Sequence, residues 1–212
     1  MTPSGSPPDA PAPSPWILRF APLIPRGARV LDVACGRGRH ARVLAARGCR
    51  VLAIDRDAAA LASLANVPGV ETRALDLEGG AWPLPGERFD AIVVVNYLHR
   101  PLFPHLLAAL AADGILLYET FARGNEAYGR PSNPDFLLVR DELLQRIRER
   151  LVIVAFEQGR VSAPGHDAVI QRLAAIGLAR AWPPELPPPA EPQGWGRVEC
   201  GKIIFFPDFP PC

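Results

Sequence analysis

The length, composition and charge of the chain argue against several classes of protein. Its 212 residues are 49% hydrophobic and 21% charged, which is enough for one sizeable core and argues against a second full domain. The net charge of +1 argues against a strong overall field that would draw the chain to nucleic acid or to an anionic membrane.

The first segment, residues 1–15, is rich in Pro, Ser and Ala. It has no basic region followed by an apolar run, so it does not resemble a signal peptide, and we expect a disordered tail. We expect residues 16–181 to form one folded domain and residues 182–212 to form a Pro-rich extension. In that extension, KIIFFP (202–207) is either an edge strand or a sticky tail.

Short apolar runs alternate with helical patterns along the first part of the chain. The runs predict strands at residues 29–34, 50–54, 70–75, 89–95 and 115–120. Because these runs are apolar on both faces, they are typical of a buried parallel sheet. Between them, the patterns predict helices at residues 39–47, 57–64 and 104–110, with Gly48 ending the first and a turn at Asp113 and Gly114 after the last. This alternation predicts a doubly wound α/β sheet.

The alternation pauses after residue 120 in a polar, turn-rich loop, FARGNEAYGRPSNPDF, which is too long for a simple connection and is typical of a lid. We then predict a helix at 140–150, a strand at 151–157, a Gly-containing connection and a strand at 168–176. Two final strands without an intervening helix indicate an antiparallel hairpin. The expected fold is Rossmann-like, with seven mostly parallel strands and helices on both faces.

One glycine-rich turn stands out in the stretch VLDVACGRGRHARVL (30–44). Gly36, Gly38 and Ala41 fit the pattern G-x-G-x-x-G/A between a strand and a helix, and Asp55 follows at the end of the next strand. This meets the fingerprint of dinucleotide-binding proteins, so an NAD(P)-binding oxidoreductase is one hypothesis. Asp32 counts against it, because this carboxylate would lie where a pyrophosphate would come near.

The turn resembles the first motif of the class I S-adenosylmethionine-dependent methyltransferases. That motif runs acid, apolar, small, x, Gly, x, Gly, and here it is DVACGRG, from Asp32 to Gly38. Ala34 stands where many members have glycine, and we expect an ordinary negative φ there. PWILRF near the N-terminus and the continuation GRGRH resemble the tellurite-resistance-like, small-molecule branch of the family.

The resemblance implies S-adenosylmethionine as the cofactor. In the family, the acids corresponding to Asp32, Asp55 and Asp76 lie near the amino group, the ribose hydroxyls and the adenine amine. A sulfonium cation with an uncharged nucleoside suits carboxylates at strand ends better than a phosphate cradle does. The predicted cofactor-binding residues are Arg19, Asp32, Ala34, Cys35, Gly36, Gly38, Arg39, His40, Asp55, Arg56, Asp76, Leu77 and Asn96.

Alternatives remain open for individual residues. Asp55 could cap the following helix, although Asp57 is better placed to do so. Asp76 could be a simple turn residue. Arg39 and His40 open a helix whose N-terminus could receive the methionine carboxylate, but His40 could also be a partly exposed helix residue.

The acceptor is expected beyond the fourth and fifth strands. His99 is the candidate general base and Tyr97 an orienting group, but His99 could also be an incidental surface residue, and an anionic acceptor needs no base. The predicted acceptor-binding residues are Arg100, Glu119, Tyr128, Arg130 and Asn133.

These observations predict a methyltransferase for a small-molecule acceptor. The alternatives are the oxidoreductase and a catalytically silent S-adenosylmethionine-binding protein. We expect no nucleic-acid or membrane partner, a monomer or homodimer, and a cytoplasmic location. The cysteines have no C-x-x-C pair and no metal-ligand spacing with histidine, so we expect no metal site; they are Cys35, Cys49, Cys200 and Cys212.

Overall fold

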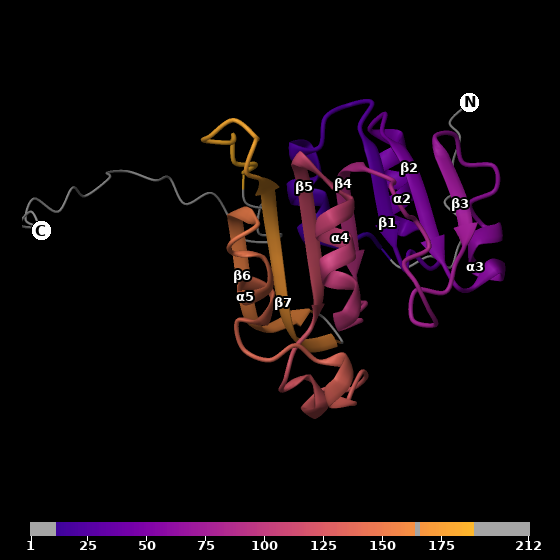
Figure 1. Ribbon diagram of the computed structural model, residues 1–212. Coiled ribbons are helices and arrows are strands. Elements are labelled where there is room, and N and C mark those ends of the chain that lie inside the picture. Colours follow the sequence, from indigo (N-terminus) through magenta and orange to yellow (C-terminus); the bar gives the residue numbers. More distant parts are fainter. Residues whose placement is uncertain (1–11, 164–165, 189–212) are drawn as a thin grey trace, which may run out of the picture.

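A seven-stranded sheet forms the centre of the molecule. The computed structural model describes residues 12–163 and 166–188. Over these residues the strand order is β3-β2-β1-β4-β5-β7-β6 (Figure 1). The first five strands pair with one another in parallel, and β7 is antiparallel to both β5 and β6. The predicted fold class is therefore confirmed.

The parallel strands lie close to where the apolar runs predicted them. They are β1 (Arg29–Val33), β2 (Arg50–Asp55), β3 (Val70–Ala74), β4 (Phe89–Val95) and β5 (Leu110–Phe121). The predicted turn at Asp113 and Gly114 is wrong, because both residues lie inside β5. The pairing of β5 with β4 is irregular at this point: Leu110 pairs with Phe89 and the next pair is Ile115 with Ala91. The extra residues of β5 therefore form a bulge.

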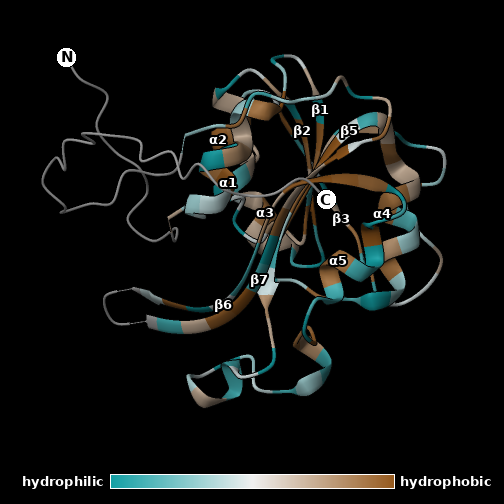
Figure 2. Ribbon diagram, turned by 90° about the vertical axis from the view of Figure 1, so that its left-hand side faces the viewer, coloured by the Kyte–Doolittle hydropathy of each residue, from teal (hydrophilic) through white to brown (hydrophobic). Residues whose placement is uncertain are grey.

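The last two strands form the predicted antiparallel hairpin, but they are longer than expected. β6 (Leu151–Ala163) pairs with β7 (His166–Gly177) along its length. The predicted Gly-containing connection is wrong, because Gly159 lies within β6 and faces Ile170, so the ladder continues through it. Figure 2 shows the hairpin extending outward from the rest of the sheet.

Helices cover both faces of the sheet. Buried residues of α1 (Pro15–Phe20), α2 (Arg39–Ala46) and α3 (Ala58–Ala62) share one apolar cluster with one face. Those of α4 (Phe103–Ala109) and α5 (Glu142–Ile147) share a second cluster with the other face. Short 3-10 turns complete the set: η1 (Ala21–Leu23), η2 (Arg100–Leu102), η3 (Asn125–Ala127) and η4 (Pro134–Phe136).

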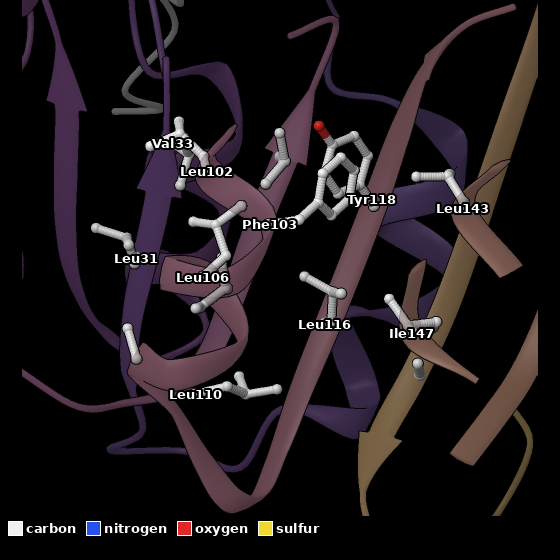
Figure 3. Close-up of a cluster of buried hydrophobic side chains, with 14 of the residues drawn as sticks. Leu31, Val33, Leu102, Phe103, Leu106, Leu110, Leu116, Tyr118, Leu143 and Ile147 are labelled. Carbon is white, nitrogen blue, oxygen red and sulfur yellow. The ribbon is translucent and has the colours of Figure 1, made fainter. Parts of the chain in front are cut away.

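The core on the α4 and α5 side shows how the strand alternation works. Leu31 and Val33 of β1 point to this face, where Leu106 of α4 and Ile147 of α5 also lie (Figure 3). Every second residue of β1 therefore packs here, while Val30 packs in the opposite cluster. Asp32 shares the face of Val30, so its carboxylate is on the α1 and α2 side.

Ser14 and Pro15, which we expected in a disordered tail, belong to the fold. Ser14 is buried, and its side chain accepts hydrogen bonds from the backbone N–H groups of Trp16 and Ile17 at the start of α1. Residues 1–11, KIIFFP, Cys200 and Cys212 lie outside the described residues. Within the described part of the chain, no helix is both long and apolar enough to span a membrane.

Candidate functional site

The glycine-rich turn connects β1 to α2 through a series of left-handed residues. Ala34, Gly36 and Gly38 have φ values of 51°, 54° and 71°. The expectation of a negative φ at Ala34 is wrong, because the turn forces this residue into a region that non-glycine residues rarely adopt. At Gly38 a Cβ atom would come within 2.4 Å of the Leu64 side chain, so glycine is also needed for packing.

Asp32 lies under this turn and is 1% exposed. Within the part of the chain that the structure describes, neither of its carboxylate oxygens has a hydrogen-bond partner of normal geometry. Burial raises the pKa of Asp32 to about 7, although the backbone N–H of Ala41 and the charge of Arg39 act in the opposite direction. A buried carboxylate without a partner is costly, so this position favours a ligand that donates hydrogen bonds and carries positive charge.

A cavity of about 320 Å³ opens beside the turn, at the carboxyl ends of the parallel strands. Open α/β sheets bind ligands at this edge, and the volume is in the range of small-molecule sites. The cavity combines three carboxylates, one arginine and an apolar wall. Its lining residues are Ala34, Asp55, Arg56, Leu75, Asp76, Leu77, Glu78, Tyr97 and Phe136.

Asp55 ties the turn to the cavity. Its Oδ2 accepts the backbone N–H of Gly36 at 2.8 Å, and its Oδ1 accepts the backbone N–H of Asp57 at 2.9 Å. Asp57 is the residue that caps α3, through bonds from the N–H groups of Ala59 and Ala60. The capping alternative therefore does not account for Asp55, whose carboxylate holds the turn and lines the cavity.

Asp76 and Tyr97 line the same cavity from the segments that follow β3 and β4. Asp76 accepts the backbone N–H of Glu78 at 2.9 Å, so it is a turn residue as well as a lining residue. The Tyr97 hydroxyl is buried and has no hydrogen bond of normal geometry to any described residue. Burial, with the nearby charge of Glu78, raises the pKa of Tyr97, so the phenol stays protonated at neutral pH.

Two residues of α2 face the N-terminal segment and do not line the cavity. His40 is buried, and its Nε2 accepts the backbone N–H of Ser14 at 3.0 Å. Burial and the charge of Arg39 lower the pKa of His40 to about 3, so the ring is neutral. Arg39 donates to the carbonyl of Ala12 at 3.1 Å. The alternative of a partly exposed His40 is wrong, and its Nε2 accepts a hydrogen bond from the protein.

Only some of the remaining predicted cofactor residues line the cavity. Arg56 and Leu77 line it, whereas Arg19 lies 3.8 Å from a Glu157 carboxylate oxygen and above the Phe20 ring. Cys35 is buried in the turn, where burial raises the pKa of its thiol. Asn96 is exposed at the end of β4 with a φ of 57°.

The predicted acceptor and catalytic residues other than Tyr97 do not line this cavity. His99 precedes η2, and Arg100 binds Glu142 and the long loop. Glu119 faces Arg172 at 3.5 Å. The others lie on the long loop: the Tyr128 ring is under Arg160, the Asn133 side chain caps η4, and Arg130 precedes a cis proline.

Three lining residues were not predicted from the sequence: Leu75, Glu78 and Phe136. The first two flank Asp76 in the stretch LDLE, so the strand-end argument could have included them. Phe136 comes from the long loop, and its only signal was an aromatic residue inside a polar stretch. Among residues 12–163 and 166–188, no group of three or more His, Cys, Asp or Glu residues could hold a metal ion.

Comparisons with known proteins agree with this geometry. Residues 30–113 match the family model described as a methyltransferase domain. This part of the chain, which is less than half of its length, is therefore similar to methyltransferase domains. The matched residues run from β1 into β5 and include the glycine turn and all three predicted acids.

Solved structures show the same fold at low sequence identity. TehB from Haemophilus influenzae has a TM-score of 0.63 and 17% identity, over 76% of this chain and 61% of that one. The 1,6-didemethyltoxoflavin-N1-methyltransferase of Burkholderia thailandensis, solved with 1,6-didemethyltoxoflavin and S-adenosylhomocysteine, has a TM-score of 0.57 and 23% identity over 76% of each chain.

One curated relative matches a short part of the sequence. It is the ribosomal RNA small subunit methyltransferase J of Psychromonas ingrahamii, 38% identical over 85 residues. The match covers 36% of this chain and 33% of that protein, so the chain spans about a third of the length of this relative.

Proposed function

We propose that this protein transfers a methyl group from S-adenosylmethionine to a small-molecule acceptor. The observation that carries the proposal is the buried carboxylate of Asp32 under the glycine turn, where neither oxygen has a hydrogen-bond partner of normal geometry among the described residues. A pyrophosphate beside this carboxylate would bring two anions together, whereas an ammonium group would supply the missing positive charge and donors. The same turn therefore suits an amino-acid-bearing cofactor better than a dinucleotide.

The cavity suits the rest of this cofactor. Asp55 would hold the ribose hydroxyls and Asp76 the adenine amine, and the apolar walls of Leu75 and Leu77 would pack on the base. Asp32 does not line the cavity but lies buried under the adjoining turn, where it would attract the amino group. Each oxygen of Asp55 already accepts one backbone N–H, and each retains a lone pair for a further donor. When bound, S-adenosylmethionine supplies an electrophilic methyl group on a positively charged sulfur.

The protein's part in the reaction is to hold the acceptor and exclude water. Tyr97 keeps its proton, so it serves as a hydrogen-bond donor that orients a group in the cavity. His99 remains our candidate for the base, and it would be needed only for an acceptor that is protonated at neutral pH. Arg100, Glu119, Tyr128, Arg130 and Asn133 remain predictions for the acceptor side.

Asp55→Ala tests the cofactor assignment. We expect the affinity for S-adenosylhomocysteine, measured by calorimetry, to fall by about ten- to a hundredfold, because the variant loses charge-assisted hydrogen bonds. Asp55→Asn should have a smaller effect, since an amide can still accept the Gly36 N–H. Asp57→Ala is the matched control: it removes a neighbouring acid and the α3 cap, but Asp57 does not line the cavity. Unchanged affinity in Asp55→Ala would contradict the assignment.

The alternative functions give different results with the wild-type protein. If NADH quenches the fluorescence of the protein and S-adenosylhomocysteine does not bind, the oxidoreductase is favoured. Tight cofactor binding without transfer to thiols, oxyanions, amines or RNA would favour a catalytically silent binding protein. The short match to a ribosomal RNA methyltransferase makes RNA the one macromolecular acceptor that the screen must include.

A further inference from the structure

The long loop between β5 and α5 is closed at its base. Ala122 and Leu138 form an isolated bridge, the N–H of Leu138 donates to the carbonyl of Phe121 at 3.0 Å, and the N–H of Arg123 donates to the carbonyl of Leu138 at 2.9 Å. Farther out, the Asn125 side chain donates to the Pro131 carbonyl and accepts the N–H of Val169. These bonds tie the loop to itself and to β7, so it has the character of a compact Ω-loop.

Arg100 fixes one particular point of this loop. Its guanidinium donates to the carbonyl of Asp135 at 2.6 Å and to the carbonyl of Leu137 at 2.9 Å. These carbonyls belong to the two residues that flank Phe136. The same guanidinium also makes a two-point pair with Glu142, at 2.9 and 3.0 Å. The planar fork of arginine can make these four bonds at once, whereas a lysine ammonium has only three donors and lacks the fork geometry.

Glu142 anchors this arrangement to α5. Its side chain is 7% exposed and accepts bonds from Arg100, from Arg146 and from the backbone N–H of Val139. Burial alone would raise the pKa of Glu142, but these donors outweigh it and lower the pKa to about 2. The carboxylate is therefore charged at neutral pH and holds the arginine fork in place.

Phe136 is half exposed although the backbone on both sides of it is hydrogen-bonded to Arg100. It lines the cavity together with Asp55 and Tyr97, yet 49% of its surface is exposed. A large apolar ring that is fixed at the edge of a cavity and left half exposed is typical of a surface that a ligand covers. The bonds on both sides of Phe136 fix its backbone at the cavity edge before any ligand binds.

We propose that Phe136 forms the outer wall of the cofactor cavity and that Arg100 is the positioning residue that holds this wall, through the carbonyls of Asp135 and Leu137 and its pair with Glu142. This inference rests on the proposed function, because it takes the nucleoside of S-adenosylmethionine as the group that the ring covers. It gives Arg100 a role different from acceptor binding. A preformed wall lowers the entropic cost of binding, so its loss weakens the affinity for the cofactor.

Calorimetric titration with S-adenosylhomocysteine tests the proposal in a double-mutant cycle. We expect Phe136→Ala to weaken binding about tenfold, since it removes one aromatic packing surface. We expect Arg100→Lys to weaken it about three- to tenfold, because lysine cannot hold both carbonyls and Glu142. In the Phe136→Ala background, Arg100→Lys should have less than about a twofold further effect, because the wall it positions is gone.

Arg146→Lys is the matched control. Arg146 also binds Glu142, but the structure gives it no bond to the loop carbonyls of Asp135 or Leu137, so we expect its affinity to stay within about twofold of wild type. Thermal unfolding of each variant reports whether it is folded, and Arg100→Gln provides a second substitution at the same position. Unchanged affinity in Arg100→Lys and Arg100→Gln, or additive effects with Phe136→Ala, would overturn the proposal. If wild-type protein fails to bind S-adenosylhomocysteine, the proposed function fails instead.

Discussion

At the scale of single residues, the three predicted acids have different environments. Asp32 is buried, and neither of its oxygens has a hydrogen-bond partner of normal geometry in the part of the chain that the structure describes. Asp55 and Asp76 accept backbone N–H groups at the cavity wall. Only Asp32 therefore carries a large cost of burial in the free protein. We infer that Asp32 lowers the stability of the free protein but favours binding of the ligand, because a ligand that supplies positive charge would remove the cost of burial.

Asp32→Asn tests this exchange. The pKa of Asp32 is raised from 3.8 to about 7, so the folded state retains a proton that the unfolded state releases. The buried Asp32 carboxyl group therefore destabilises the folded state increasingly as the pH rises from about 4 to about 7. Above that pH the destabilisation stays constant, at on the order of 4 kcal/mol. We expect the Tm of Asp32→Asn relative to wild type to be several degrees higher at pH 8 than at pH 5, and binding of S-adenosylmethionine to be lost.

Asp57→Asn is the control for this experiment, because Asp57 is exposed and near the same turn. Its Tm difference from wild type is measured at the same two pH values as the reference. A Tm difference for Asp32→Asn that is equal at pH 5 and pH 8 would show that Asp32 is not a neutral buried acid in the free protein.

The residue scale also shows what the sequence could predict about the site. Asp32, Asp55 and Asp76 could be placed because each follows a recognisable strand, and parallel strands end at one edge of a sheet. The positive φ of Ala34 could not, because alanine normally avoids that region and only the constraints of the whole turn require it. The partners of Arg100 could not be predicted from the sequence either, because they lie 35 to 42 positions farther along the chain.

At the scale of elements, α2 also stabilises the N-terminal segment of the described chain. Its first turn holds the segment that leads into α1, through Arg39 to Ala12 and through His40 to Ser14. Ser14 in turn caps α1, which packs Trp16 and Phe20 into the core. The connection between β1 and α2 and the start of α1 are therefore one structural unit.

His40→Gln tests the role of this connection in stability. The pKa of His40 is lowered from 6.5 to about 3, so the folded protein keeps the ring neutral while the unfolded chain takes up a proton. The contribution of His40 to stability is thus complete above about pH 6.5 and declines as the pH falls toward 3. Glutamine can accept a hydrogen bond and does not titrate. We therefore expect the Tm of the variant relative to that of wild type to be higher at pH 5 than at pH 7.

His40→Ala is the companion variant. It leaves the buried N–H of Ser14 without its acceptor, and we expect it to lower the Tm at pH 7 by several degrees, since such a loss costs about 1–3 kcal/mol. A Tm difference between His40→Gln and wild type that does not change with pH would contradict the buried, neutral state of His40.

The elements themselves were predictable to different degrees. The parallel strands were found because burial on both faces leaves an uninterrupted apolar run, as in Phe89–Val95. β6 and β7 were predicted too short, because polar residues and Gly159 continue a ladder whose length depends on pairing between the strands. The limits of a strand are set by its neighbour, and a single segment does not contain that information.

At the scale of the whole molecule, the charge distribution bears on the class of acceptor. The net charge is +1, and several arginines are paired within the structure, as Arg100 and Arg146 are with Glu142 and Arg172 is with Glu119. Binding to RNA depends on free cationic groups that displace counterions from phosphates, and it weakens steeply with salt. Paired arginines contribute less to such binding, so the global charge supports a small acceptor.

Methyl transfer from labelled S-adenosylmethionine into a fractionated cell extract tests this inference. We expect label in the small-molecule fraction and none in RNA of the small ribosomal subunit, and we expect filter binding of that RNA near 0.15 M salt to be no tighter than about 10⁻⁶ M, the range of non-specific association. Asp55→Ala, assayed in parallel, should remove label from every fraction, because the cofactor site serves all acceptors. Label in the RNA that persists at 0.15 M salt and disappears in Asp55→Ala would make RNA the acceptor. The cofactor assignment would stand in that case, because Asp55 would still be required, and only the acceptor half of the proposal would be replaced.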